Sequence, residues 1–162
     1  MPTRRVIALI AVLTLGSAAA LAQPAPDRDA CPYAAVELQA ALGVSVDEGK
    51  PGPTTRFAGG RAVSCQYAAQ GKSTASVVVN RTVYTNPADP SIAMMARMRA
   101  GAFEKVAADP DGAEFQEQGD ITNATLHYLR KGSQVEVRVT IGPKQPGFAA
   151  MKAKLLTLRR LP

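Results

Sequence analysis

Two cysteines have the best-defined chemistry in this chain of 162 residues. Cys31 and Cys65 are its only cysteines, and an even number of cysteines in an exported chain indicates a disulfide. Redox-active pairs usually have the C-x-x-C spacing, and two thiolates alone do not complete a zinc site. We therefore predict a structural Cys31–Cys65 bond that closes a loop of about 35 residues and contributes roughly 4 kcal/mol of stability.

The single histidine, His127, is the next candidate. On an extended strand it shares a face with Thr125 and Leu129. It is either a general base or metal ligand, or an ordinary histidine on the surface of a sheet. A hydrolase triad would need a nucleophile motif, and the chain has no Gly-x-Ser-x-Gly. Because a zinc site would also need more His or Cys ligands, we interpret His127 as a surface residue.

Acidic residues gather around one predicted turn: Asp109, Asp111, Glu114, Glu117 and Asp120. Paired carboxylates can hydrolyse glycosides when a cleft holds them at the right separation. The ligand spacing of an EF-hand calcium loop is not present. We interpret this cluster as a solvated loop.

Met94 and Met98 are separated by one helical turn, so two thioethers could meet. Thioethers are soft ligands that favour Cu(I), but methionine also fills gaps in hydrophobic cores. We predict packing in the core or at the surface here, with no metal or other cofactor, and keep copper as the alternative.

The N-terminus carries an export signal. Arg4 and Arg5 precede an uncharged apolar run over residues 6–15, and Ala20-Leu21-Ala22 offers the small-x-small cleavage pattern. The run is short for a membrane span, which needs about 20 residues. Cleavage after Ala22 would leave no stable membrane anchor, and we predict a periplasmic or secreted protein. The predicted organisation is a signal peptide (1–22), a flexible leader (23–30) and a single α+β domain (31–162).

Two stretches with alternating apolar residues predict β-hairpins. The first spans residues 61–84 and turns at 70–72; the second spans 123–142 and turns at 131–133. In the return strand of the second hairpin, Val135, Val137, Val139 and Ile141 face inward. Its outward residues are Gln134, Glu136, Arg138 and Thr140, and together with His127 they form the predicted binding surface.

Three helices are predicted, over residues 33–42, 90–106 and 147–160. Gly43 suits a left-handed helix end, and Asp89-Pro90 suits a capped helix start. We expect an α+β fold in the order helix-hairpin-helix-hairpin-helix. Its mostly antiparallel sheet would have 4–6 strands, with the helices packed on one face.

The first half of this pattern is similar to that of a known family. Cys31-Pro32, a helix ending at Leu42-Gly43, a Gly/Pro connector and Cys65-Gln66-Tyr67 before a valine-rich strand resemble a domain of unknown function common among actinobacterial lipoproteins. The resemblance covers about residues 31–83. It implies an α+β domain with one disulfide and supplies no catalytic residues. Those relatives often carry a lipobox cysteine, which this sequence lacks.

The formal net charge is +6 and aromatic residues make up 5% of the chain, without tryptophan. Readers of single-stranded nucleic acids need aromatic residues on a basic face, so we expect no nucleic-acid partner. We expect a non-enzymatic exported domain that binds a protein or an envelope component, with an inhibitor or immunity role as one form. A carrier of a small apolar ligand is the second hypothesis, and an enzyme of unknown type is the third.

Overall fold

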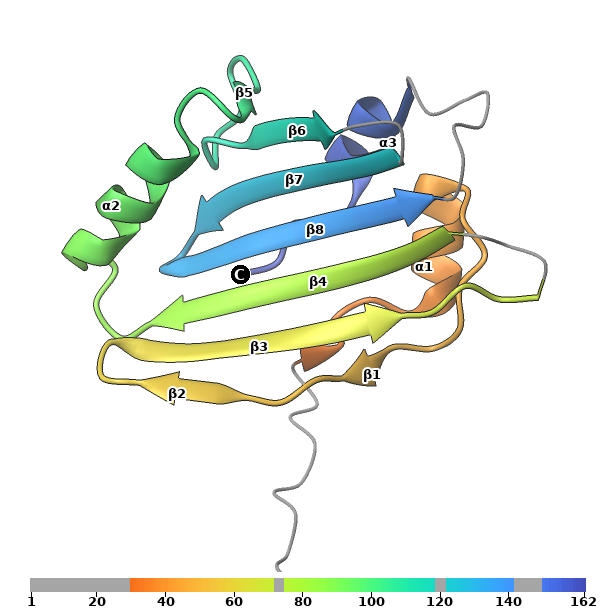
Figure 1. Cartoon of the computed structure of the whole chain (residues 1–162), viewed down its shortest axis with the longest axis horizontal. Coiled ribbons are helices and arrows are strands. Elements are labelled where there is room, and N and C mark those ends of the chain that lie inside the picture. The colour runs from red at the N-terminus through yellow and green to blue at the C-terminus, as the bar shows by residue number, and fades with distance from the viewer. Residues whose placement is uncertain (1–29, 72–74, 119–121, 142–149) are drawn as a thin grey trace, which may run out of the picture.

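The computed structural model describes residues 30–71, 75–118, 122–141 and 150–162. The predicted signal peptide (1–22) and all but the last residue of the predicted leader (23–30) lie outside these ranges. The described part is dominated by one antiparallel sheet, with three short helices around it (Figure 1).

Within the described residues, the sheet contains eight strands. Seven follow the order β1-β3-β4-β8-β7-β6-β5, and β2 also pairs with the outer edge of β3. The strands are β1 (Lys50–Pro51), β2 (Thr55–Phe57), β3 (Gly60–Tyr67), β4 (Ala75–Tyr84), β5 (Glu104–Lys105), β6 (Glu114–Gln118), β7 (Thr122–Arg130) and β8 (Ser133–Ile141). The helices are α1 (Ala35–Leu42), α2 (Pro90–Arg99) and α3 (Met151–Thr157). None of them has the length and apolar character needed to cross a membrane, within the ranges that the structure describes.

The fold prediction was wrong in its proportions. The two hairpins are confirmed as β3–β4 and β7–β8, and they join through antiparallel pairing of β4 with β8. The structure is nevertheless richer in strand than a helix-hairpin-helix-hairpin-helix fold of 4–6 strands. The connector before β3 pairs with it as β1 and β2, and residues 104–105, which we assigned to a helix, form β5.

The second helix is shorter than predicted. Asp89 caps it, accepting a hydrogen bond from the Ser91 backbone N–H at 2.8 Å, and Pro90 occupies its first turn. The backbone turns extended at Ala100, and Gly101 takes a left-handed φ of 87°. Phe103, which we placed on the inner face of this helix, therefore belongs to a loop.

The core lies between one face of the sheet and two helices. α1 and α3 lie behind the sheet in Figure 1, and Leu38, Leu42, Met151 and Leu155 are their buried residues. The sheet contributes alternate side chains of its central strands, including Val77, Val79, Leu126, Tyr128, Val135, Val137 and Val139. Gly43 ends α1 in the left-handed conformation predicted for it, with a φ of 71°.

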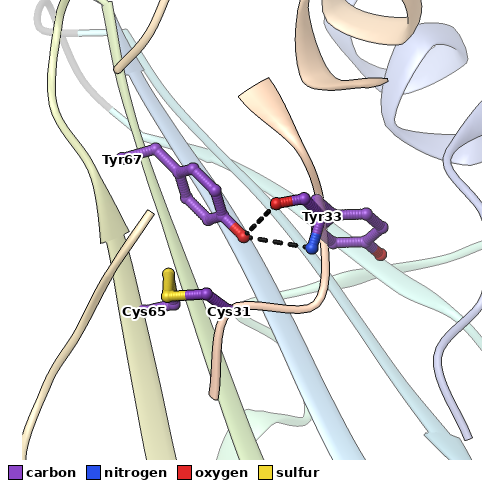
Figure 2. Close-up of a disulfide and its surroundings, with 4 residues drawn as sticks. All are labelled: Cys31, Tyr33, Cys65 and Tyr67. Carbon is purple, nitrogen blue, oxygen red and sulfur yellow. Dashed lines mark hydrogen bonds between the residues drawn. A yellow bond between two sulfur atoms is a disulfide. The ribbon is translucent and has the colours of Figure 1, made fainter. Parts of the chain in front are cut away.

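The predicted disulfide between Cys31 and Cys65 is present and joins the segment before α1 to the C-terminal part of β3 (Figure 2). Two residues further along each segment, the Tyr67 hydroxyl accepts a hydrogen bond from the Tyr33 N–H at 3.1 Å. It donates one to the Tyr33 carbonyl at 2.9 Å. The covalent bond and this buried pair together fix α1 against the sheet.

The C-terminal residues are held by two tyrosines. The Tyr33 hydroxyl donates to the Arg159 carbonyl at 2.9 Å, and the Leu161 N–H donates to the Tyr128 hydroxyl at 2.9 Å. Arg160 bonds Asp109 at 2.6 Å, and the Asp109 carboxylate also accepts the Asp111 N–H. Around Asp109, the predicted solvated loop is therefore an ordered loop bonded to the C-terminal segment. Glu114 and Glu117 belong to β6, and Asp120 lies outside the described residues.

Candidate functional site

The face of the sheet opposite α1 and α3, here called the polar face, carries the predicted surface residues. Gln134, Glu136, Arg138 and Thr140 alternate along β8 with valines of the core, as expected from the two-residue period of a strand. His127 lies on the same face of the neighbouring strand β7. Its register partner is Glu136, whereas Thr140 lies near the far end of β8 and bonds Asn123 at 2.7 Å.

Pairing across the sheet places His127 in a row of polar residues. Glu114 of β6 is its partner on one side, and Glu136 of β8 is its partner on the other. Asn80 of β4 continues the row beyond Glu136. The sequence did not predict a role for Asn80 or the position of Glu114 beside the histidine. The alternation within each strand was visible, but nothing in the sequence gave the order of the strands.

His127 is buried, with 4% of its surface exposed, although we expected it at the surface. The Phe103 ring lies edge-on to the imidazole with 6.5 Å between ring centroids. Burial, followed by the charge of Arg99, lowers the pKa of His127 to about 4, so the ring is neutral at pH 7. Its Nδ1 lies 3.9 Å from Glu114 Oε2, and its Nε2 has no hydrogen-bond partner among the described residues.

The carboxylates that flank His127 are both ion-paired. Arg99 Nε lies 3.3 Å from Glu114 Oε2, and Arg138 Nη2 lies 3.1 Å from Glu136 Oε1. In the part of the chain that the structure describes, no three His, Cys, Asp or Glu residues are placed to hold a metal ion. The row therefore combines a neutral imidazole with two carboxylates that are each ion-paired to an arginine. The His127 Nε2 atom is left available to form a hydrogen bond with a ligand.

A cleft lies between α2 and the polar face, and we call it the α2 cleft. It consists of two hollows with volumes of about 230 Å³ and 410 Å³, and both are lined by His127 and Gln134. The smaller hollow is also lined by Ile92, Ala96, Arg99, Asp111, Gly112, Glu114 and Leu129. The larger one is also lined by Phe57, Asn80, Thr82, Tyr84, Ser91, Met94, Met95 and Glu136. The predicted surface residues Arg138 and Thr140 do not line either hollow.

Because α2 borders the polar face, the helices do not all pack on one face as we predicted. The helix has no buried residue, which leaves its apolar side chains at the surface. Among the described residues, six large hydrophobic side chains are exposed, and five of them belong to α2 or line the cleft: Phe57, Met94, Met95, Met98 and Leu129. The sixth, Val36, is on α1.

The two methionines of the copper alternative are both exposed, Met94 at 55% and Met98 at 71%. Of the two kinds of packing predicted for them, in the core or at the surface, the core is excluded because no residue of α2 is buried. Met94 lines the larger hollow, whereas Met98 does not line either of the two. Their thioethers are therefore accessible to solvent, and binding of Cu(I) by these two methionines stays an alternative.

Comparison of the chain with protein-family models, with curated proteins and with solved structures found no match. The resemblance to the actinobacterial lipoprotein domain therefore stays a prediction.

Proposed function

We propose that this protein is an exported, non-enzymatic binding domain that holds a protein or an envelope component in the α2 cleft. One observation carries the proposal: exposed apolar side chains gather around a cleft whose floor is polar. Exposed apolar groups cost solvation free energy, and their concentration at one place is typical of a binding site. Methionine adds an adaptable surface because its side chain is unbranched and flexible.

Export is part of the same proposal. The Cys31–Cys65 bond requires an oxidising compartment in most organisms. The basic start, the apolar run and Ala20-Leu21-Ala22 supply the corresponding signal. A periplasmic or secreted location agrees with both features.

The floor of the cleft bears on the choice between a polar partner and an apolar cargo. Asn80, Gln134 and Glu136 line it, and burying such groups against a wholly apolar molecule would leave them without hydrogen bonds. The cleft therefore favours a partner with its own polar groups over the small apolar ligand of the second hypothesis.

Site-specific photo-crosslinking tests the proposal. A diazirine side chain is placed at Met95, in the cleft, and in a second variant at Val36, an exposed residue on α1. In intact envelopes, we expect position 95 to give a discrete adduct that excess unlabelled protein suppresses. Position 36 is the matched control and should give none. If position 95 gives no adduct, or if both positions give the same adducts, the cleft is not the binding site.

A further inference from the structure

The larger hollow of the α2 cleft has unused hydrogen-bonding groups on its floor. Glu136 Oε1 accepts the Asn80 amide at 3.1 Å and the Arg138 guanidinium at 3.1 Å. Gln134 Oε1 accepts the Tyr84 hydroxyl at 3.0 Å. These bonds to described residues use Glu136 Oε1, Asn80 Nδ2 and Gln134 Oε1, and they do not use Glu136 Oε2, Asn80 Oδ1 or the Gln134 amide nitrogen. The floor thus offers two acceptors and one donor from adjacent strands.

These groups are held in place by the sheet. Gln134 and Glu136 are two residues apart on β8, and Asn80 is the register partner of Glu136 on β4. The Arg138 and Asn80 bonds also fix the orientation of the Glu136 carboxylate. Because the polar atoms are preorganised on rigid strands, a ligand loses little free energy in ordering them.

An aromatic pair forms the wall of the same hollow. Phe57, 43% exposed, lies edge-on to Tyr84, with ring centroids 6.1 Å apart and an interplanar angle of 72°. Met94 and Met95 add apolar surface from the α2 side. The hollow therefore presents fixed donors and acceptors on one side and aromatic and thioether surface on the others.

We infer that the occupant of the larger hollow is a sugar ring of an envelope glycan, most simply an N-acetylated amino sugar; this inference rests on the proposed function. Neighbouring sugar hydroxyls each donate and accept hydrogen bonds, which matches a carboxylate beside two amides. The C–H groups of the ring suit an aromatic wall, and an acetamido methyl group suits the methionines. A wholly apolar ligand would leave the floor groups unpaired.

Calorimetric titration of the disulfide-bonded mature protein with three tetrasaccharides tests the inference. The probes are a β-1,4-linked N-acetylglucosamine tetramer, a β-1,4-linked glucose tetramer without acetamido groups and an α-1,4-linked glucose tetramer. We expect the N-acetylated tetramer to bind most tightly. Gln134→Ala and Phe57→Ala should each weaken it by about tenfold, the loss expected for a buried hydrogen bond or an aromatic contact. Val36→Ala is the control and should bind as the wild type does.

The outcomes separate the inference from the proposed function. Lack of binding to all three tetramers overturns the inference, and so does binding that Gln134→Ala and Phe57→Ala leave unchanged, since the sugar would then lie elsewhere. If the tetramers do not bind but position 95 crosslinks to a protein, the partner is a polypeptide and the proposed function stands. If crosslinking fails as well, both are wrong. Equal urea midpoints for all variants would show that each one is folded.

Discussion

At the scale of single residues, several polar side chains are buried, and most of them have hydrogen-bond partners within the protein. Tyr33, Tyr67 and Tyr128 each place a hydroxyl in a hydrogen bond with the backbone at the edge of the core. Burial raises the pKa of all three tyrosines, so they stay neutral donors and acceptors. His127 differs from them, because its Nε2 is buried and has no partner among the described residues. An unpaired atom beside a cleft is a natural contact for a ligand.

The buried histidine predicts a pH dependence of stability. Its pKa is about 4 in the folded protein against 6.5 as the reference, so the folded state binds fewer protons than the unfolded state. Stability is therefore full above pH 6.5 and falls as the pH drops toward 4, by up to about 3 kcal/mol. Urea unfolding at pH 7, 5 and 4 measures this loss. His127→Gln should show a shallower decline, and an identical decline in both proteins would contradict the assignment.

Tyr67 is fully buried, and its hydroxyl should contribute measurably to stability. Tyr67→Phe removes the hydroxyl that bonds the Tyr33 N–H and carbonyl and leaves two buried backbone groups unpaired. We expect a loss of about 1–3 kcal/mol in the free energy of unfolding. Tyr84→Phe, whose hydroxyl bonds the partly buried Gln134, is the control and should cost less than about 1 kcal/mol. If the two variants lost the same unfolding free energy, the buried hydrogen bonds of Tyr67 would contribute no more to stability than the partly buried one of Tyr84.

At the scale of elements, the helices divide into two that build the core and one that does not. α1 and α3 bury leucine and methionine against the sheet. α2 is stabilised locally by Asp89 and Pro90 and borders the α2 cleft. The pKa of Asp89 is lowered, first by its hydrogen bond to the Ser91 hydroxyl and then by its bond to the Ser91 N–H, so this cap stays charged.

Substitutions in α1 and α2 should therefore have different effects. Leu38→Ala removes a fully buried side chain of α1 and should cost about 2–5 kcal/mol. Met98→Gln changes a side chain that is 71% exposed on α2 and should alter stability by less than about 0.5 kcal/mol. Thermal or urea unfolding compares the two. A loss of several kcal/mol from Met98→Gln would contradict the view that the Met98 side chain is exposed and contributes nothing to the core.

The disulfide acts between two elements that are separated by 34 residues in the chain. Replacing both cysteines, Cys31→Ala with Cys65→Ala, releases that loop in the unfolded state. The chain-entropy model predicts a loss of about 4 kcal/mol. Urea unfolding of the variant should resemble that of the wild type kept reduced, which serves as the control. If the double variant loses less than about 1 kcal/mol of unfolding free energy, the chain-entropy estimate is wrong for this bond, and the Tyr33–Tyr67 hydrogen bonds are enough to hold the segment before α1 against β3.

At the scale of the whole molecule, the two faces of the sheet differ in their residues and in their exposure to solvent. The face under α1 and α3 is packed with valine, leucine and tyrosine and supplies the stability. The opposite face carries amides, hydroxyls and ion pairs that cost little to expose and remain available to a ligand. Antiparallel sheets commonly have this division between a buried and a solvated face.

Hydrogen exchange should follow the same division. The amides of β4 and β8 lie in the centre of the sheet with long pairings on both sides, and we expect them to exchange most slowly. The amides of α2 should exchange much faster, since no residue of that helix is buried. Mass spectrometry of peptic fragments resolves these segments. If the amides of α2 were as strongly protected from exchange as those of β8 in the free protein, the view that α2 is weakly packed against the rest of the molecule would be contradicted.

The sequence by itself determined local features. Alternation predicted the β3–β4 and β7–β8 hairpins, Gly43 marked the end of α1, and Asp89-Pro90 marked the start of α2. These features depend on the geometry of a few adjacent residues, which is why they could be recognised. The disulfide was also predictable, because Cys31 and Cys65 are the only two cysteines of the chain and an even count favours pairing between them.

Only the tertiary structure decided which strands are neighbours. A strand's pattern tells which residues share a face but not which strand lies alongside, so the pairing of β4 with β8 and the row Glu114-His127-Glu136 could not be predicted. The two-residue strands β1 and β5 carry no pattern of their own and form because an edge offers unpaired backbone groups. The contact between Phe103 and the buried His127 also arises only in three dimensions, because α2 ends at Arg99 and the chain turns at Gly101 where the helical pattern had predicted a longer helix.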